Sequence, residues 1–182
     1  MNMPQRDWAV LATGPSLTQA QADAVRGRFG VIAVSDAYRL APWADALVST
    51  DSAWWRHHKP RFAGRRFSAL GHKGTEPVRG HAPGSNSGAL AVRVARSLGA
   101  RLIVLLGFDG HGSHFFGDHP APLVNTTPAR RRIHAQQHAA EAAACAAAGI
   151  QIFNCTPGTA LTCYPIATLD EVLDATAQAA AA

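Results

Sequence analysis

The segment formed by residues 8–21 constrains the fold more than any other part of the sequence. It is apolar over residues 8–12, is interrupted by a Gly-Pro-Ser turn at residues 14–16, and then places Thr18 and Gln21 at the spacing of a helix-capping box. This order predicts a buried strand, a tight turn and the start of a helix. In a parallel sheet such a turn lies at the carboxyl end of its strand, where backbone N–H groups and the helix dipole favour an anionic ligand.

The same alternation continues to the end of the chain. Apolar runs predict further strands at residues 31–36, 46–51, 65–70, 101–109 and 150–155. Helices are predicted at 18–28, 88–99, 128–149 and 167–177, a short helix or turn at 52–58, and loops at 71–84 and 110–127. Strands that alternate with helices indicate an α/β fold. We expect one Rossmann-like, doubly wound domain over residues 1–182, with a mostly parallel sheet and helices on both faces.

Composition narrows the class of protein. The chain has 182 residues, of which 47% are hydrophobic, and it contains no apolar run of the roughly 18 residues that a membrane span needs. Its first residues lack the layout of a secretion signal, and its three cysteines form no C-x-x-C pair. We therefore expect a cytoplasmic protein with reduced thiols, either monomeric or a homo-oligomer.

The positive charge points to an anionic partner. The formal net charge is +5, and the basic residues are mostly scattered apart from the run Arg130, Arg131 and Arg132. No nucleic-acid-binding motif accompanies them. Two interpretations stay open: a basic site for a phosphorylated small molecule, which we favour, or a surface that binds nucleic acid.

Polar and glycine-rich positions follow several of the predicted strands. Side chains that end adjacent parallel strands converge on one crevice, and a carboxylate beside a glycine-rich turn commonly accepts hydrogen bonds from a ribose or a base. A single aspartate of this kind would more often be a helix cap, but three occur at corresponding places. We therefore predict a nucleotide site built from Thr13, Gly14, Pro15, Ser16, Asp36, Asp51, Asn86, Ser87, Gly88, Gly107 and Asp109.

The loop at residues 110–127 holds the candidate catalytic residues. His119 is the predicted general base, because the ordinary pKa of histidine lies near neutrality, and His114 is the substitute candidate. Asp118 lies between them, and these three residue types also suit a zinc or manganese ion. A solvated loop with incidental histidines is the remaining alternative. In the late helix, the face that carries His134, His138 and Glu141 lacks the H-E-x-x-H pattern and is interpreted as a solvated flank.

Taken in order, these motifs resemble those of the small bacterial sialyltransferases, which use a CMP-activated sugar. The resemblance is a series of short matches over nearly the whole chain. The matching segments are Gly14-Pro15-Ser16-Leu17, the helix start Asn86-Ser87-Gly88, the strand end Gly107-Phe108-Asp109, the loop of residues 113–119 with its histidines, and the turn of residues 155–161. Asp36 and Asp51 stand where that family usually carries asparagine, and its lid, whose tyrosines bind phosphate, is cut here to a loop without tyrosine at about residues 110–127.

This resemblance implies a transferase. The donor is expected to be a nucleotide or a nucleotide-activated sugar, with Thr156 of the late turn at the nucleotide and His119 deprotonating the hydroxyl of an unidentified acceptor. The same core resembles the hydroxymethylpterin diphosphokinase-like family, which implies a magnesium-dependent pyrophosphokinase using Asp36, Asp51 and Asp109. Short proteins of this pattern are also found among phage and prophage products. A third hypothesis is therefore a non-catalytic module that binds phage DNA or a host protein through Arg130, Arg131 and Arg132.

Overall fold

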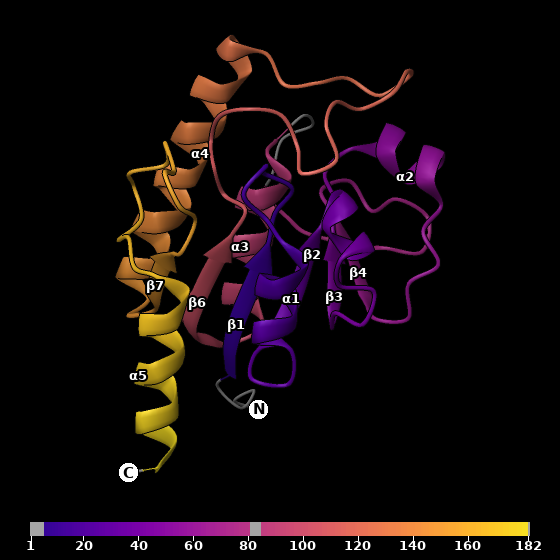
Figure 1. Cartoon of the computed structure of the whole chain (residues 1–182). Helices are drawn as coiled ribbons and strands as arrows, with labels where there is room; N and C mark the ends of the chain where they lie inside the picture. Colours follow the sequence, from indigo (N-terminus) through magenta and orange to yellow (C-terminus); the bar gives the residue numbers. More distant parts are fainter. Residues whose placement is uncertain (1–5, 81–84, 182) are drawn as a thin grey trace.

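Seven strands of the described chain form one sheet in which every neighbouring pair is parallel. This computed structural model describes residues 6–80 and 85–181. The strand order is β5-β4-β3-β2-β1-β6-β7 (Figure 1). The strands are β1 (Arg6–Leu11), β2 (Gly30–Val34), β3 (Ala46–Val48), β4 (Arg65–Ser68), β5 (Glu76–Pro77), β6 (Ala100–Leu106) and β7 (Gln151–Asn154). The predicted Rossmann-like, doubly wound α/β fold is confirmed, with an entirely parallel sheet.

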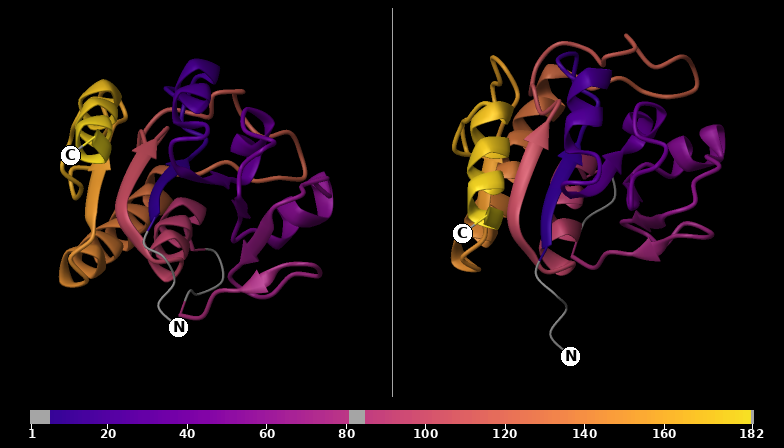
Figure 2. Two further views of the ribbon diagram at one scale, coloured as in Figure 1. Left: turned by 90° about the horizontal axis from the view of Figure 1, so that it is seen from below. Right: turned by 60° about the horizontal axis from the view of Figure 1, so that its bottom comes forward.

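Helices cover both faces of this sheet (Figure 2). They are α1 (Gln19–Val25), the 3₁₀ helix η1 (Ser35–Arg39), α2 (Ser52–His58), α3 (Ser87–Ser97), α4 (Pro128–Ala147) and α5 (Leu169–Ala181). Because successive side chains of a strand point to opposite faces, Leu11 of β1 packs in the core shared with α1, α2 and α5. Its neighbour Val10 packs in the core shared with α3 and α4. Such two-sided burial explains why the strands read as continuous apolar runs.

The first helix begins where its capping residues predict. Thr18 Oγ1 accepts a hydrogen bond from the backbone N–H of Gln21 at 3.2 Å, and the Gln21 side-chain oxygen accepts one from the Thr18 N–H at 2.9 Å. This reciprocal capping box satisfies two donors that a helix start would otherwise leave unpaired. In the described part of the chain, no helix combines the length and the apolar character needed to cross a membrane.

Several boundaries differ from those predicted. The strand predicted at 31–36 ends at Val34, because Ser35 adopts a left-handed backbone with φ +45° and the chain turns into η1. The strand predicted at 46–51 ends at Val48, and the first helix ends at Val25 and not at residue 28. The two-residue strand β5 lies in a segment predicted to be a loop, and it is too short for an alternating pattern. Positions 81–84 of that segment lie outside the described residues.

One face of α4 is buried against α3, so its interpretation as a solvated flank is wrong. Glu141 is 2% exposed, and its carboxylate binds Arg93 Nη2 at 2.6 Å and Arg96 Nη2 at 3.3 Å, both on α3. His138 Nδ1 lies 2.9 Å from the hydroxyl of Tyr164, and burial lowers the pKa of His138 to about 4. These contacts fix the helix whose first turns border the candidate site.

The sheet order places a topological switch point at β1. Strand β1 pairs with β2 on one side and with β6 on the other. Strands β2 to β5 therefore lie on one side of β1, and strands β6 and β7 lie on the other side. In open α/β sheets, the loops at such a switch point diverge at the carboxyl edge and leave a crevice. The segment that follows β6 crosses above this edge before it enters α4 (Figure 1). All of residues 110–127 are described, and they contain no helix or strand beyond a single bridge between His114 and Gly117.

Candidate functional site

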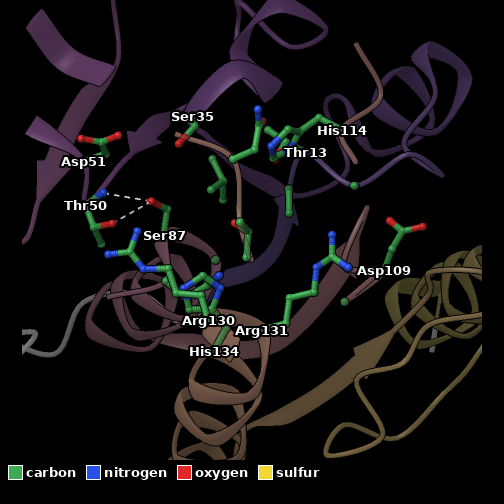
Figure 3. A pocket seen from close by; sticks show the side chains of 18 of the residues that line it. Thr13, Ser35, Thr50, Asp51, Ser87, Asp109, His114, Arg130, Arg131 and His134 are labelled. Atoms are coloured by element: carbon green, nitrogen blue, oxygen red, sulfur yellow. Dashed lines mark hydrogen bonds between the residues drawn. The ribbon is translucent and has the colours of Figure 1, made fainter. Parts of the chain in front are cut away.

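A pocket of about 710 Å³ opens at this carboxyl edge (Figure 3). Its volume is in the range of about 300–1,000 Å³ that is typical of small-molecule sites. Residues that follow β1, β2, β3, β4 and β6 line it, together with the first turns of α3 and α4. The predicted site residues that line it are Thr13, Gly14, Asp51, Asn86, Ser87, Gly88, Gly107, Asp109, His114, Asp118 and His119. Pro15, Ser16, Asp36 and Thr156 are not among its lining residues.

The turn after β1 is held by the protein itself. The Gly14 N–H donates to the Gly107 carbonyl at 2.9 Å, and the Ser16 N–H and hydroxyl donate to the Asp109 carboxylate at 3.3 and 2.9 Å. A side chain at position 14 would collide with that carboxylate and with the Gly107 carbonyl, which explains the glycine. The Gly14 and Ser16 N–H groups therefore do not face an anionic ligand as expected, because both already have acceptors within the protein.

The floor of the pocket is rich in hydroxyl groups. Ser87, at the first turn of α3, accepts a hydrogen bond from the Thr50 N–H at 3.0 Å, and the two hydroxyl oxygens are also 3.0 Å apart. The Asn86 side chain caps α3 by accepting from the Ala89 N–H at 2.9 Å. Asp51 serves as a cap as well, since its carboxylate accepts from the Ala53 N–H at 2.7 Å at the start of α2. These groups can form hydrogen bonds with a polyhydroxylated ligand.

The first turns of α4 form a cationic wall, which we define as Arg130, Arg131, Arg132 and His134. All four line the pocket, and Figure 3 places Arg130, Arg131 and His134 across from Thr13 and His114. None of the three arginines forms an ion pair with a carboxylate of the described residues, although Arg131 donates to the Gly112 carbonyl at 2.7 Å. Burial and the neighbouring Arg130 charge lower the pKa of His134, so the positive charge of this wall comes from its three arginines. This wall therefore favours an anion.

His114 and His119 line the opposite side, and Phe116 packs against both rings; we define these three residues as the histidine wall. The His114 and His119 ring centroids are 4.5 Å apart, and Phe116 stacks on His114 at 5.0 Å. His114 Nδ1 lies 2.9 Å from Thr13 Oγ1, and burial, followed by the effect of His119, lowers the pKa of His114. A neutral imidazole of this kind can accept a proton near neutral pH.

The Asn125 side chain holds the backbone of His119. Its N–H donates to the side-chain oxygen of Asn125 at 2.8 Å, and the Asn125 amide donates to the His119 carbonyl at 3.3 Å. The Nδ1 atom of His119 is buried without a hydrogen-bond partner in the described structure. The neighbouring Asp118 is exposed and accepts a hydrogen bond from Ser113. His119 thus lies at the pocket with its backbone held by Asn125 and with no hydrogen-bond partner at Nδ1 in the described structure.

Two predicted ligand contacts are internal to the protein. Asp36 is 1% exposed, and its Oδ2 accepts a hydrogen bond from Trp54 Nε1 at 2.6 Å. Thr156 is also 1% exposed, and its hydroxyl accepts from the Phe108 N–H at 2.9 Å, which ties the last turn to the end of β6. Both residues follow strand ends as predicted, but their side chains point into the core and not into the pocket.

We expect Trp54→Phe to lower the free energy of unfolding by about 1–2 kcal/mol more than Trp55→Phe. Both indoles are buried on α2, but Trp54 donates to the buried Asp36 carboxylate, whereas Trp55 donates to the neutral Ser49 carbonyl at 3.0 Å. A buried carboxylate that loses its hydrogen bond costs more than a carbonyl does. Urea unfolding followed by circular dichroism measures both variants. Equal losses would contradict a stabilising role for the Trp54–Asp36 bond.

The described part of the chain offers no set of side chains that could hold a metal ion. Residues 6–80 and 85–181 contain no group of three or more histidine, cysteine, aspartate or glutamate side chains placed to hold a metal ion. The three aspartates of the magnesium hypothesis are separately engaged: Asp36 by Trp54, Asp51 at the start of α2, and Asp109 by Ser16.

Several pocket residues were missed by the sequence prediction. Ser35 and Thr50 line the pocket, yet small polar residues after strands give no distinctive signal. The cationic wall was visible as an arginine run, but the sequence did not indicate that α4 begins at the pocket. Comparisons with protein-family models, curated proteins and solved structures found no match. The geometry of the pocket is therefore the feature that indicates a function.

Proposed function

We propose that the chain binds a nucleotide or nucleotide-activated sugar in this pocket and transfers the activated group to an acceptor hydroxyl. The observation that carries the proposal is the cationic wall: three arginines border a pocket at the carboxyl edge of the sheet and pair with no carboxylate of the described residues. Arginine is well suited to phosphate because its planar guanidinium forms paired, charge-assisted hydrogen bonds. The donor phosphate is therefore assigned to this wall.

The remaining walls suit the other parts of such a substrate. Hydroxyl and carboxylate groups of Thr50, Asp51 and Ser87 are available to the sugar hydroxyls of the donor. On the opposite side, His119 accepts the proton of the acceptor hydroxyl, with His114 as the alternative base. The acceptor oxygen then forms a bond to the transferred carbon while the bond from that carbon to the phosphate oxygen breaks. The nucleotide leaves with the electron pair, and arginine side chains stabilise its charge.

Calorimetric titration with CMP, UMP, ATP and GTP, each with and without Mg²⁺, tests the proposal directly. We expect at least one nucleotide to bind without an absolute requirement for Mg²⁺. A thermal-shift screen extended to nucleotide sugars would then identify the donor, because a ligand that binds only the folded state raises its melting temperature. Binding that occurs only for a triphosphate with Mg²⁺ would favour the pyrophosphokinase alternative. Failure of every nucleotide and nucleotide sugar to bind would overturn both.

Arg130→Gln is expected to weaken nucleotide binding about 10- to 100-fold, the range that corresponds to loss of a hydrogen bond to a charged group. Arg28→Gln is the matched control, because Arg28 is exposed and precedes β2 at the opposite edge of the sheet. Calorimetry with the best nucleotide measures both variants. Equal affinities would contradict the assignment of phosphate to the cationic wall.

Salt-sensitive binding of DNA by the intact protein, abolished when all three arginines are replaced, would instead favour the nucleic-acid hypothesis.

A further inference from the structure

Three buried polar atoms without hydrogen-bond partners belong to side chains behind or within the histidine wall. They are Asp36 Oδ1, His58 Nε2 and His119 Nδ1. Asp36 Oδ1 lies 3.7 Å from His58 Nε2 and 3.8 Å from Arg39 Nη1, which is too long for a hydrogen bond. Unpartnered buried groups are costly, so a folded protein that keeps several of them in one region invites a functional explanation.

A continuous series of contacts joins Asp36 to the histidine wall. Arg39, which follows Asp36 on η1, places its guanidinium carbon 5.4 Å from the Phe116 ring centre. Phe116 stacks on His114 with an interplanar angle of 8°, and its ring centre is 5.1 Å from that of His119. The loop that carries both histidines therefore rests on the residues that surround the buried carboxylate.

The Asp36 charge also acts on the histidines. Burial lowers the pKa of His58 and of His114, and in both cases the negative charge of Asp36 opposes that effect. Burial, followed by Asp36, raises the pKa of Tyr38. The titratable and charged groups around this region are Tyr38 and Arg39 of η1, His57 and His58 of α2, and His114, Asp118 and His119 of the loop.

We propose that Asp36 is a positioning residue that supports the histidine wall from behind, through Arg39 and Phe116, and stabilises the imidazolium that forms when this wall accepts a proton. The inference rests on the proposed transferase function. During transfer, the acceptor hydroxyl loses its proton to an imidazole nitrogen, and the acceptor oxygen keeps the electron pair. A fixed carboxylate, shielded from water, is well placed to favour the resulting positive charge. Asp36 itself touches neither substrate, since its side chain does not line the pocket.

Titration of the histidine rings by nuclear magnetic resonance tests this role without any substrate. In Asp36→Asn, which keeps the shape of the side chain and an acceptor for Trp54, we expect the pKa of His114 and of His58 to be lower than in the wild type. Asp51→Asn is the matched control, because Asp51 also follows a strand but does not contribute to the pKa of either histidine. An unchanged His114 titration in Asp36→Asn would overturn the inference.

The activity of the same variant provides the second test. Activity that depends on a neutral His114 rises with pH through the His114 pKa, and a lower His114 pKa moves this acidic limb to lower pH. We expect that movement in Asp36→Asn, together with a roughly tenfold lower kcat and a donor KM within about twofold of the wild type. A pH–activity profile and a kcat equal to those of the wild type would overturn the inference.

Arg39→Gln provides an independent variant if Asp36→Asn does not fold, because the Arg39 side chain is 52% exposed. It removes the contact with Phe116, so we expect the His114 ring resonances to shift and kcat to fall. Unchanged resonances and kcat would overturn the inference. A shifted titration in Asp36→Asn with no transfer by the wild-type protein would overturn the proposed function instead, because the titration needs no substrate.

Discussion

Replacing His119 with alanine is expected to lower kcat by about 10²–10⁴-fold while donor affinity changes little. His119 lies at the pocket wall across from the arginines, and no other side chain is hydrogen-bonded to its ring in the described structure. Removing a general base slows proton transfer in the transition state but leaves the phosphate contacts of the cationic wall intact. Steady-state kinetics with the identified donor, paired with calorimetry, separates the two quantities.

The control for this experiment is His111→Ala. His111 also lines the pocket, but it is exposed, and its Nε2 atom lies 3.0 Å from the Gly158 carbonyl oxygen. We expect its removal to leave kcat within a few-fold of the wild type. If His114→Ala lost the larger share of turnover, the role of base would belong to His114, whose tautomer is linked to Thr13. A collapse of nucleotide binding in His119→Ala would make His119 a binding residue.

Glu141→Ala is expected to lower the free energy of unfolding by about 3–5 kcal/mol, because it leaves two cations without their buried partner. Arg93 Nε and Nη2 approach Glu141 Oε1 at 2.8 and 2.6 Å, and Arg96 reaches the other oxygen. The two arginine side chains are 28% and 31% exposed. Water can therefore hydrate both cations in the variant, so we expect a loss at the lower end of this range. Urea unfolding measures the change.

Glu76→Ala is the matched control. Its two carboxylate oxygens accept hydrogen bonds from Arg65 Nε and Nη2 at 2.9 and 2.7 Å, but both side chains are about half exposed. Exposed pairs of this kind contribute about 0–1 kcal/mol. A loss in Glu141→Ala no larger than in Glu76→Ala would mean that the α3–α4 contact is maintained by apolar packing alone. In that case the position of the cationic wall would not depend on this ion pair.

The fold could be predicted because its signals are local and repeated. Apolar runs such as residues 101–106 have the continuous character of strands buried on both faces, and the Thr18–Gln21 capping box marks a helix start with its own side chains. The alternation of strand and helix then implies parallel pairing, since each helix returns the chain to the same end of the sheet. Strand β5 was missed because two residues carry no periodicity.

The candidate site could be predicted only in part. Strand ends meet at one edge of a parallel sheet by geometry, so the aspartates and glycines after the strands were placed in the correct neighbourhood. Their orientation was not predictable. At Ser35 the backbone turns to φ +45°, and this single residue directs Asp36 toward Trp54 and away from the pocket. The burial of Glu141 likewise depends on two arginines that lie more than forty positions earlier in the chain.

The order of residues alone determined that this protein forms a doubly wound α/β sheet with its polar turns at one edge, because burial and capping act over a few neighbouring residues. The three-dimensional packing sets which of those turns line the pocket. It brings the first turns of α4 to the pocket as a cationic wall, it uses the N–H groups of the first turn for internal contacts, and it buries Asp36 behind two histidines. The physical reason is that the direction of a side chain at a strand end depends on one or two backbone angles and on partners far away in the sequence.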